Sequence, residues 1–195
     1  MQLVNNNGFP KKKMLNFDNQ ITTAINSLTG RNVALDFAAI FLAKHVIFLL
    51  VLSIAVSWFA RSDRATWRFR AISCCLAVTV GLLLNQGILL FLSRVRPYDL
   101  GLTHIIVEKS ADPSFPSDHA TVAFAIALML ILVRDRFAIP YLILAAFVAL
   151  ARVFVGLHFF SDVAGGAMTA LIGTVVVRKL YKSNSRLNDV LTRFL

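Results

Sequence analysis

Cysteine is scarce in this chain of 195 residues, and its two cysteines, Cys74 and Cys75, are neighbours within an apolar stretch. Two adjacent thiols provide neither a disulfide framework nor a cysteine-based metal site. Acidic residues are also few: 10 Asp and Glu stand against 20 Lys and Arg, for a formal net charge of +10. The basic residues are scattered between hydrophobic stretches, which argues against a nucleic-acid-binding protein. Cytoplasmic loops and attraction to anionic lipid headgroups explain the positive charge better.

Charged residues of both signs make up only 15% of the chain, whereas hydrophobic residues make up 57%. Long uncharged runs recur, which is typical of an integral membrane protein and not of a soluble core. We predict an all-α fold, a polytopic bundle of about five transmembrane helices. The expected spans are residues 33–59, 71–92, 118–133, 137–154 and 162–177.

The segment before the first span has a different pattern. Apolar residues recur at helical spacing from Met14 to Leu28, with polar residues between them. This pattern predicts an amphipathic helix, which either lies in the membrane interface or packs on the bundle as a short helix. The lysines at positions 11–13 are not followed by an apolar stretch, so no secretory signal peptide is indicated. We divide the chain into a tail with this helix (1–30, of which 1–13 are expected to be disordered), a transmembrane domain (31–182) and a basic C-terminal tail (183–195).

Single residues within the spans predict contacts between helices. Lys44 and His45 lie close to the middle of the first span, where charge is costly and usually faces the bundle interior. We therefore expect both to make polar contacts inside the bundle. Asn85 in the second span is expected to form an interhelical hydrogen bond. Gly165 and Gly166 in the fifth span are small enough to allow close packing.

The basic residues also predict an orientation. Residues 61–70, the turn 134–136 and the C-terminal tail are rich in Lys and Arg, so all three are expected in the cytoplasm. With five spans, the connections 93–117 and 155–161 then share the outer face. The lysines at 11–13 conflict with this arrangement, because they would lie outside as well.

Polar residues gather at the ends of the apolar runs that meet on this outer face. The stretch Ser114-Phe115-Pro116-Ser117-Asp118-His119 comes immediately before an apolar run. Proline, Ser117 and Asp118 favour a helix start, and the free N–H groups of such a start can bind an anion. His119 lies in the first turn, where it can give a proton to a bound group. Taken alone, Ser-Asp before a helix most often serves only as a cap.

Two further clusters change that interpretation. Arg96-Pro97 lies in the long outer connection, and Arg152, His158 and Asp162 lie at the ends of the fourth and fifth spans. Arginine offers planar, bidentate donors to phosphate oxygens, so two arginines, a hydroxyl and a helix N-terminus predict a phosphate pocket without a metal. His158 and Asp162 stand at i and i+4, which suits a nucleophilic histidine oriented by a carboxylate. His119 would then protonate the leaving oxygen.

Together, Arg96-Pro97, the run 116–119, and Arg152 with His158 and Asp162 resemble the three signatures of the type-2 phosphatidic acid phosphatase superfamily. The resemblance covers roughly residues 30–180. It implies the helical core of that superfamily, a phosphohistidine intermediate, and neither a metal nor another cofactor. It implies His158 as the nucleophile, Asp162 as its partner and His119 as the acid. The phosphate ligands that it implies are Arg96, Ser117, Arg152 and backbone N–H groups near Asp118.

This chain departs from the usual signatures at three positions. Leu89 stands where the superfamily usually has Lys, Asp118 where it usually has Gly, and Ala151 where it often has Ser. The first two departures make the chain most similar to the bacterial undecaprenyl-diphosphate phosphatases of the bacitracin-resistance type. Arg94 and Lys109 are the candidates to supply the missing positive charge, although a surface or interface charge is the commoner role for either. The Asp118 carboxylate is expected to turn from the phosphate toward Arg94, Lys109 or a loop donor, because like charges repel.

The leading hypothesis is a membrane hydrolase that removes the terminal phosphate of undecaprenyl diphosphate, which recycles the lipid carrier for cell-wall synthesis. The expected partners are this isoprenoid diphosphate and the bilayer, with no nucleic acid. The expected location is the bacterial cytoplasmic membrane, with the site facing the extracytoplasmic side. Three alternatives stay open: a broad lipid phosphatase acting on phosphatidic acid or phosphatidylglycerol phosphate, a phosphotransferase with the same intermediate, and a non-enzymatic transporter or scaffold.

Overall fold

The computed structural model describes residues 11–59, 63–183, 188 and 190, and within these residues it contains α-helices and loops but no strand. The helices are α1 (Lys11–Asn26), α2 (Val33–Lys44), α3 (Val46–Ser57), α4 (Arg64–Leu89), α5 (Asp118–Leu132), α6 (Ala138–Phe154) and α7 (Phe160–Leu180). The prediction of an all-α helical bundle is therefore confirmed for the described part of the chain. Residues 1–10 and most of the predicted C-terminal tail lie outside it.

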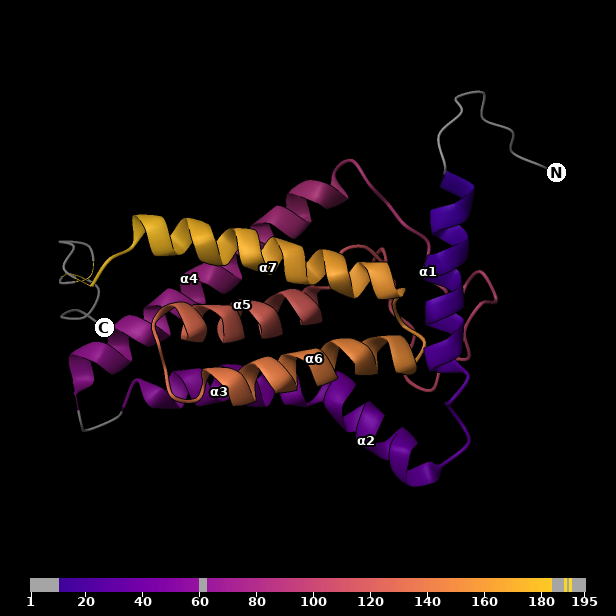
Figure 1. The fold of residues 1–195 in the computed structure, drawn as a ribbon, viewed down its shortest axis with the longest axis horizontal. Helices are drawn as coiled ribbons and strands as arrows, with labels where there is room; N and C mark the ends of the chain where they lie inside the picture. Colours follow the sequence, from indigo (N-terminus) through magenta and orange to yellow (C-terminus); the bar gives the residue numbers. More distant parts are fainter. Residues whose placement is uncertain (1–10, 60–62, 184–187, 189, 191–195) are drawn as a thin grey trace.

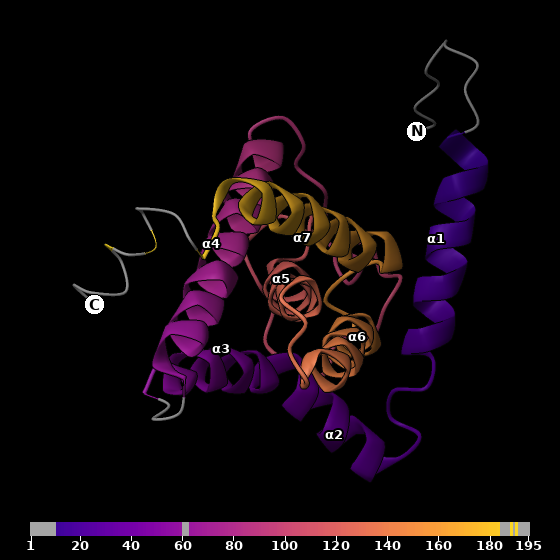
Figure 2. The same cartoon turned by 60° about the vertical axis from the view of Figure 1, so that its left-hand side comes forward.

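Helix α5 occupies the centre of the bundle and contacts α3, α4, α6 and α7 (Figures 1 and 2). Its buried side chains are mostly small, including Ala120, Ala123 and Ala127, so neighbouring helices approach its backbone. Helix α7 packs tightly against the start of α5 at Gly166, where an added Cβ would lie 2.5 Å from the carbonyl oxygen of Ser117. The prediction that glycines of the last span allow close packing is confirmed at this position, since no side chain fits there.

The predicted spans coincide with apolar helices, although their lengths differ. Helices α4 and α7 are long and apolar enough to cross a membrane, and α2 with α3 passes the same test as a pair bent by 46°. Helices α5 and α6 have 15 and 17 residues, fewer than the roughly 20 that cross a hydrocarbon core. Five apolar segments are therefore observed, and the number of membrane crossings stays a prediction. The second segment begins at Arg64 rather than at residue 71, so most of the predicted loop 61–70 is helical.

The expectation that Lys44 and His45 lie inside the bundle is wrong. The first span breaks there, and α2 ends at Lys44. The side chain of His45 is exposed, with its ring 5.6 Å from that of Phe41. Lys44 forms an ion pair with Glu108 of the outer connection, at 2.6 Å. The break turns both polar side chains out of the apolar interior, where burial of an unpaired charge is costly.

Helix α1 lies across the ends of α6 and α7 and packs on the bundle (Figure 1). Its buried residues are polar. Asn26 donates from Nδ2 to the carbonyl oxygens of Phe154 (2.7 Å) and His104 (2.9 Å), and Thr22 accepts from the backbone N–H of Phe160 (3.0 Å). Phe17 is 65% exposed on the outer side. Of the two sequence alternatives, packing on the bundle is observed, and a position in the membrane interface stays a prediction.

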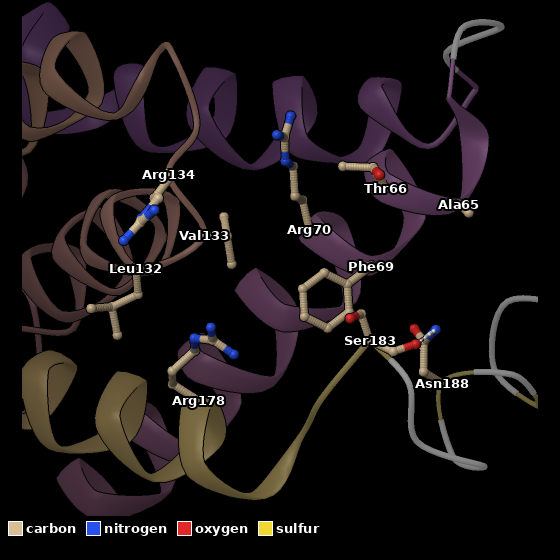
Figure 3. A pocket seen from close by; sticks show the side chains of 10 residues that line it. All are labelled: Ala65, Thr66, Phe69, Arg70, Leu132, Val133, Arg134, Arg178, Ser183 and Asn188. Carbon is tan, nitrogen blue, oxygen red and sulfur yellow. Dashed lines mark hydrogen bonds between the residues drawn. The ribbon is translucent and has the colours of Figure 1, made fainter.

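The described parts of the three basic segments predicted to share the cytoplasm meet at one end of the bundle. Thr66, Arg70, Arg134 and Arg178 line a cavity of about 570 Å³ there (Figure 3). Arg70 forms an ion pair with the buried Asp135 at 2.7 Å. The polar connections 93–117 and 155–159 lie at the opposite end. That the basic segments lie at one end of the bundle agrees with the prediction that they share one side of the membrane. Which side that is stays a prediction.

Candidate functional site

The candidate site lies where the long connection after α4 meets the ends of three helices. Residues 90–117 contain turns but no helix. A backbone hydrogen bond from Ser114 to Arg94 (2.8 Å) closes this connection on itself, and one from Ser117 to Asp162 of α7 (3.1 Å) ties it to the bundle. The start of α5, the end of α6 and the start of α7 therefore face one another across it. Residues far apart in the sequence are brought together at this end.

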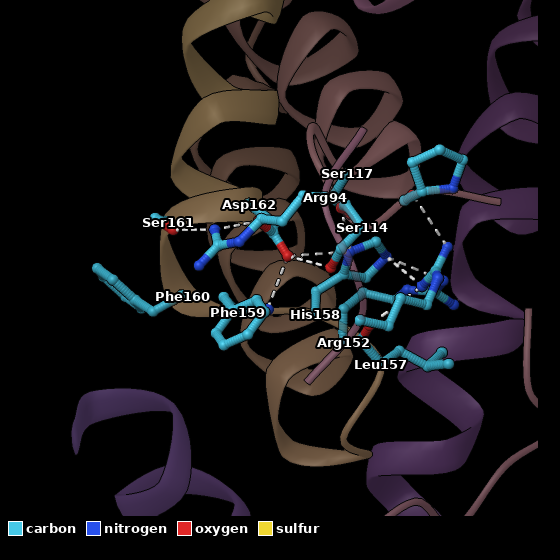
Figure 4. A network of polar contacts seen from close by, with 12 residues as sticks. Arg94, Ser114, Ser117, Arg152, Leu157, His158, Phe159, Phe160, Ser161 and Asp162 are labelled. Atoms are coloured by element: carbon cyan, nitrogen blue, oxygen red, sulfur yellow. Dashed lines mark hydrogen bonds and ion pairs between the residues drawn. The ribbon is translucent and has the colours of Figure 1, made fainter. Parts of the chain in front are cut away.

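His158 is the buried centre of the site (Figure 4). Its Nδ1 lies 2.8 Å from the carbonyl oxygen of Ser114, which can only accept a hydrogen bond. The ring proton therefore belongs on Nδ1, and Nε2 keeps its lone pair. Nε2 lies 3.4 Å from Nη1 of Arg96 and 3.4 Å from Nη2 of Arg152. Burial lowers the pKa of His158 from its usual 6.5, against the opposing effect of the Asp162 carboxylate. The neutral imidazole is the form that a nucleophile needs.

Asp162 is fully buried behind His158 but makes no direct hydrogen bond to it. Its Oδ2 lies 3.6 Å from Nδ1 of His158. The carboxylate instead accepts from the hydroxyl of Ser114, from the backbone N–H of Phe159 (2.8 Å) and from Nη1 of Arg94 (2.6 Å). Ser114 thus connects the two residues, because its hydroxyl donates to Asp162 while its carbonyl accepts from His158. The contact predicted between His158 and Asp162 is therefore an electrostatic interaction at 3.6 Å, without a direct hydrogen bond.

Arg94 and Lys109 do not supply a positive charge to the site. Arg94 joins Asp162 to Asp18 of α1, with 2.7 Å between its Nη2 and Oδ2 of Asp18, and its guanidinium lies 3.7 Å from the centre of the Phe159 ring. Lys109 lies 3.8 Å from Asp99. Both candidates named from the sequence are therefore already paired with carboxylates.

Arg96 and Arg152 are buried on the side of His158 away from Asp162. Backbone carbonyl oxygens hold them: Arg96 donates to Asp112 (2.8 Å) and Leu157 (3.0 Å), and Arg152 donates to Ala43 (3.2 Å). Carbonyl oxygens carry no net charge, so both guanidinium groups keep their positive charge for a ligand.

Two buried polar atoms at this place have no hydrogen-bond partner within the described residues, Oγ of Ser117 and Nε of Arg152. Ser117 precedes α5 but its hydroxyl does not cap the helix. Buried polar groups are normally satisfied, because an unpaired one keeps its desolvation cost. Each of these atoms can donate a hydrogen bond, so each can bind an acceptor oxygen of a ligand that reaches it.

A cavity of about 290 Å³ opens at the site. Its lining includes five of the predicted residues, Arg96, Asp118, His119, Arg152 and His158. Ser117 and Asp162 lie beneath this surface, each 0% exposed. The site thus offers an unprotonated imidazole nitrogen beside two guanidinium groups, with a second imidazole and a helix N-terminus at the rim. This arrangement can bind a phosphate-sized anion and place a nucleophile against it.

The lining also holds two of the three residues at which the chain departs from the superfamily pattern, Leu89 and Asp118. Leu89 lines the cavity without contributing charge. Asp118 accepts a hydrogen bond from Nδ2 of Asn85 on α4, at 2.6 Å. Its partner is therefore neither Arg94 nor Lys109. Asn85 also donates to Thr121, at 2.9 Å, so the predicted interhelical hydrogen bond is confirmed.

The sequence did not indicate the roles of Ser114 and Asp18, and it gave Arg94 a different role. Ser114 stands at the start of the stretch singled out before α5. Arg94, named as a candidate for the missing positive charge, instead pairs with Asp162 and Asp18. No sequence pattern indicated Asp18 as part of the site, because its contact with Arg94 spans 76 positions.

Comparison with known proteins agrees with this geometry. A family model described as the PAP2 superfamily matches residues 70–186. The undecaprenyl-diphosphatase BcrC of Bacillus subtilis is 28% identical over 153 residues, which are 78% of this chain and 78% of that protein. A Bacillus licheniformis protein named bacitracin transport permease protein BcrC is 29% identical over 154 residues, 78% of this chain and 75% of that one.

The fold also has counterparts among solved structures. A transmembrane PAP2-type phosphatidylglycerolphosphate phosphatase from Bacillus subtilis superposes with a TM-score of 0.66 at 23% identity, over 91% of this chain and 90% of that one. At this identity the likeness concerns the fold alone. Because the family model covers more than half of the sequence and the same region builds the site, this chain belongs to the PAP2 superfamily and is related to membrane lipid phosphatases.

Proposed function

We propose that the protein is an undecaprenyl-diphosphate phosphatase that releases the terminal phosphate of its substrate through a phosphohistidine, without a metal. The observation that carries the proposal is the environment of His158 Nε2. This nitrogen is unprotonated and faces the guanidinium groups of Arg96 and Arg152. Two guanidinium groups beside the nucleophilic nitrogen can stabilise an anion that it attacks, and a phosphoryl group is such an anion.

The reaction has two steps. In the first, Nε2 of His158 attacks the terminal phosphorus, and the N–P bond forms while the bond to the bridging oxygen breaks. The bridging oxygen keeps the electron pair and receives a proton from His119, so the lipid leaves as a monophosphate. In the second step water attacks the phosphohistidine and gives a proton back to His119. The N–P bond breaks, and inorganic phosphate leaves.

The other site residues support these steps. Arg96, Arg152, the hydroxyl of Ser117 and the N–H groups at the start of α5 are suited to hold the equatorial oxygens. Asp162 and Ser114 orient the ring of His158, since the Ser114 carbonyl holds the proton on Nδ1. Asp162 also adds a negative charge that favours the imidazole as it becomes electron-poor during attack.

The choice of substrate is supported by chemistry and by the relatives. A diphosphate leaves as a phosphate monoester, a better leaving group than the alkoxide of a lipid monoester. Such a substrate depends less on the cation that Leu89 has replaced. The relative from Bacillus subtilis is itself named an undecaprenyl-diphosphatase. A site at the end of an apolar bundle also receives the headgroup of a lipid that is already in the membrane.

Phosphate release from the purified protein tests this proposal. The substrates are a long-chain isoprenoid diphosphate, phosphatidic acid and phosphatidylglycerol phosphate, in one detergent and with EDTA present. We expect kcat/KM to be at least about tenfold higher for the diphosphate, which corresponds to roughly 1.4 kcal/mol of barrier. His158→Ala should abolish turnover, whereas His104→Ala, at an exposed loop histidine, should not. Equal rates on phosphatidic acid would favour the broad lipid phosphatase, and restoration of lost activity by Mg²⁺ would refute the metal-free chemistry.

We further propose that the site faces the extracytoplasmic side of a bacterial cytoplasmic membrane. In a variant with both native cysteines removed, a membrane-impermeant thiol reagent applied to whole cells should label His104→Cys but not Thr66→Cys. These positions lie at the two ends of the bundle. The reverse pattern would place the chemistry on the cytoplasmic leaflet.

A further inference from the structure

A second cavity adjoins the site and has no role in the steps above. It has a volume of about 260 Å³ and is lined by Lys44, Val107, Glu108, Ser110, His119, Arg152 and Leu157. Ser110, His119 and Arg152 also line the cavity that contains His158. The two cavities are therefore neighbours, with His119 and Arg152 between them.

Lys44 reaches this second cavity because the first apolar segment is broken. Helix α2 ends at Lys44, and the chain bends by 46° into α3. The carbonyl oxygen of the preceding residue, Ala43, accepts a hydrogen bond from Nη1 of Arg152 (3.2 Å). The other terminal nitrogen of Arg152 faces Nε2 of His158. A single side chain thus connects the backbone next to Lys44 with the nucleophile.

The present partner of Lys44 is easily exchanged. Oε2 of Glu108 lies 2.6 Å from Nζ of Lys44, and the side chains of Glu108 and Lys44 are 79% and 36% exposed, respectively. Exposed ion pairs contribute little net stability, because water solvates both groups when they separate. Arg94, in contrast, is bound to a carboxylate that is fully buried. Of the two cations that line the second cavity, Lys44 can therefore change partners more readily, because Arg152 is buried.

The direction of phosphoryl transfer indicates which partner Lys44 would take. In an in-line displacement the attacking nitrogen and the leaving oxygen lie on opposite sides of phosphorus. His158 lines the first cavity only, and His119, the proposed donor to the leaving oxygen, lines both. The part of the substrate beyond the leaving oxygen then points into the second cavity, toward Lys44.

We infer that Lys44 binds the phosphate of the substrate that is not transferred, and so makes the site selective for diphosphates. This inference rests on the proposed function. A lipid monoester has no second phosphate, so its leaving group would gain nothing from Lys44. The ammonium group is a compact point charge and suits a phosphate whose position differs between bound substrate and departing product. Lys44 thereby supplies a cation at the second cavity, which Leu89 does not line.

Lys44→Met tests the inference, because it removes the charge and keeps an apolar side chain of similar length. We expect kcat/KM for a long-chain isoprenoid diphosphate to fall about tenfold or more, as for loss of one charge-assisted contact, with less than a twofold change for phosphatidic acid. Lys44→Arg should keep most of the selectivity. Lys109→Met is the matched control, since Lys109 is also a loop-facing lysine paired with an acid but lines neither cavity.

Inhibition provides a measurement that does not depend on turnover of the diphosphate. Lys44→Met should weaken inhibition by inorganic pyrophosphate about tenfold or more while leaving inhibition by inorganic phosphate unchanged. An equal loss on both substrates, or an unchanged pyrophosphate inhibition constant, would overturn the role of Lys44 and leave the proposed function standing. If the wild-type protein hydrolyses only monoesters, the proposed function fails, and the pyrophosphate constants still decide whether Lys44 binds a second phosphate. Thermal unfolding of each variant shows that the comparison is made on folded protein.

Discussion

Substituting Arg94 by Met removes the cation that joins the buried carboxylate of Asp162 to helix α1. Arg94 donates to Asp162 at 2.6 Å and to Asp18 at 2.7 Å, and it also donates to the hydroxyl of Ser161 at 2.6 Å. None of these atoms lines the cavity at His158. The substitution should therefore lower kcat much more than it raises KM.

The magnitude follows from what the carboxylate loses and what it keeps. Truncating one partner of a buried, hydrogen-bonded charge pair costs about 2–5 kcal/mol. Asp162 is fully buried, but Arg94 is 21% exposed and the carboxylate keeps its donors from Ser114 and Phe159. These remaining contacts indicate the lower end of the range, about 2 kcal/mol, or roughly 30-fold in kcat. Asp18→Asn should cost less, because the amide oxygen can still accept from the N–H of Ser161.

The assay is steady-state phosphate release from folded protein, together with thermal unfolding in the same detergent. Arg136→Met is the control: its guanidinium also lies over a phenylalanine ring, at 4.6 Å from Phe137, but at the opposite end of the bundle. It should leave kcat unchanged. If Arg94→Met is folded and retains at least half of the wild-type kcat, the ion pairs of Arg94 with Asp18 and Asp162 do not position Asp162.

Three further outcomes are expected. Since burial lowers the pKa of His158 below 6.5, its Nε2 stays unprotonated at neutral pH, and the loss of kcat/KM that its protonation causes should appear only below pH 6.5; a midpoint above 6.5 for this acidic limb would contradict the assignment. Arg96→Lys and Arg152→Lys should each lower single-turnover rates by about two to three decades, because Lys lacks the bidentate fork; near-wild-type rates would show that charge alone suffices. Gly166→Ala should lower the free energy of unfolding by about 1–3 kcal/mol, because the new Cβ meets a backbone oxygen at 2.5 Å, whereas Gly87→Ala has open space and should not.

The apolar helices and the position of the site were predictable because both depend on short-range pattern. Long uncharged runs place helices wherever they occur, since an apolar segment must bury its backbone hydrogen bonds. Helix α5 begins at Asp118, the residue predicted from the Pro-Ser-Asp sequence before it. The same reasoning placed Arg96, Arg152 and His158 at one end of the bundle, because residues at matching ends of antiparallel helices must meet.

The partners of those residues were not predictable, because each depends on how distant segments cross. Nδ1 of His158 contacts the carbonyl of Ser114 and not the carboxylate four residues along its own chain. That outcome depends on the path of the connection 90–117, which no periodicity describes. The break in the first apolar segment after Lys44 was unpredictable for the same reason. A charge in the middle of an apolar run predicts a partner inside the bundle. In the structure the helix breaks instead, and Lys44 pairs with Glu108 of the outer connection, which the sequence near Lys44 does not indicate.

The sequence by itself therefore determined that this is an all-α membrane protein of the PAP2 superfamily, and which side chains stand at the end where its helices meet. Those properties follow from hydrophobicity and from residue order along single segments. The tertiary structure alone decided that Arg94 pairs with two carboxylates, one of them on α1, and that Lys44 lines a second cavity beside His119. The physical reason is distance along the chain. A contact over 60 or more positions depends on the crossing of helices and the course of loops, and the local sequence contains neither.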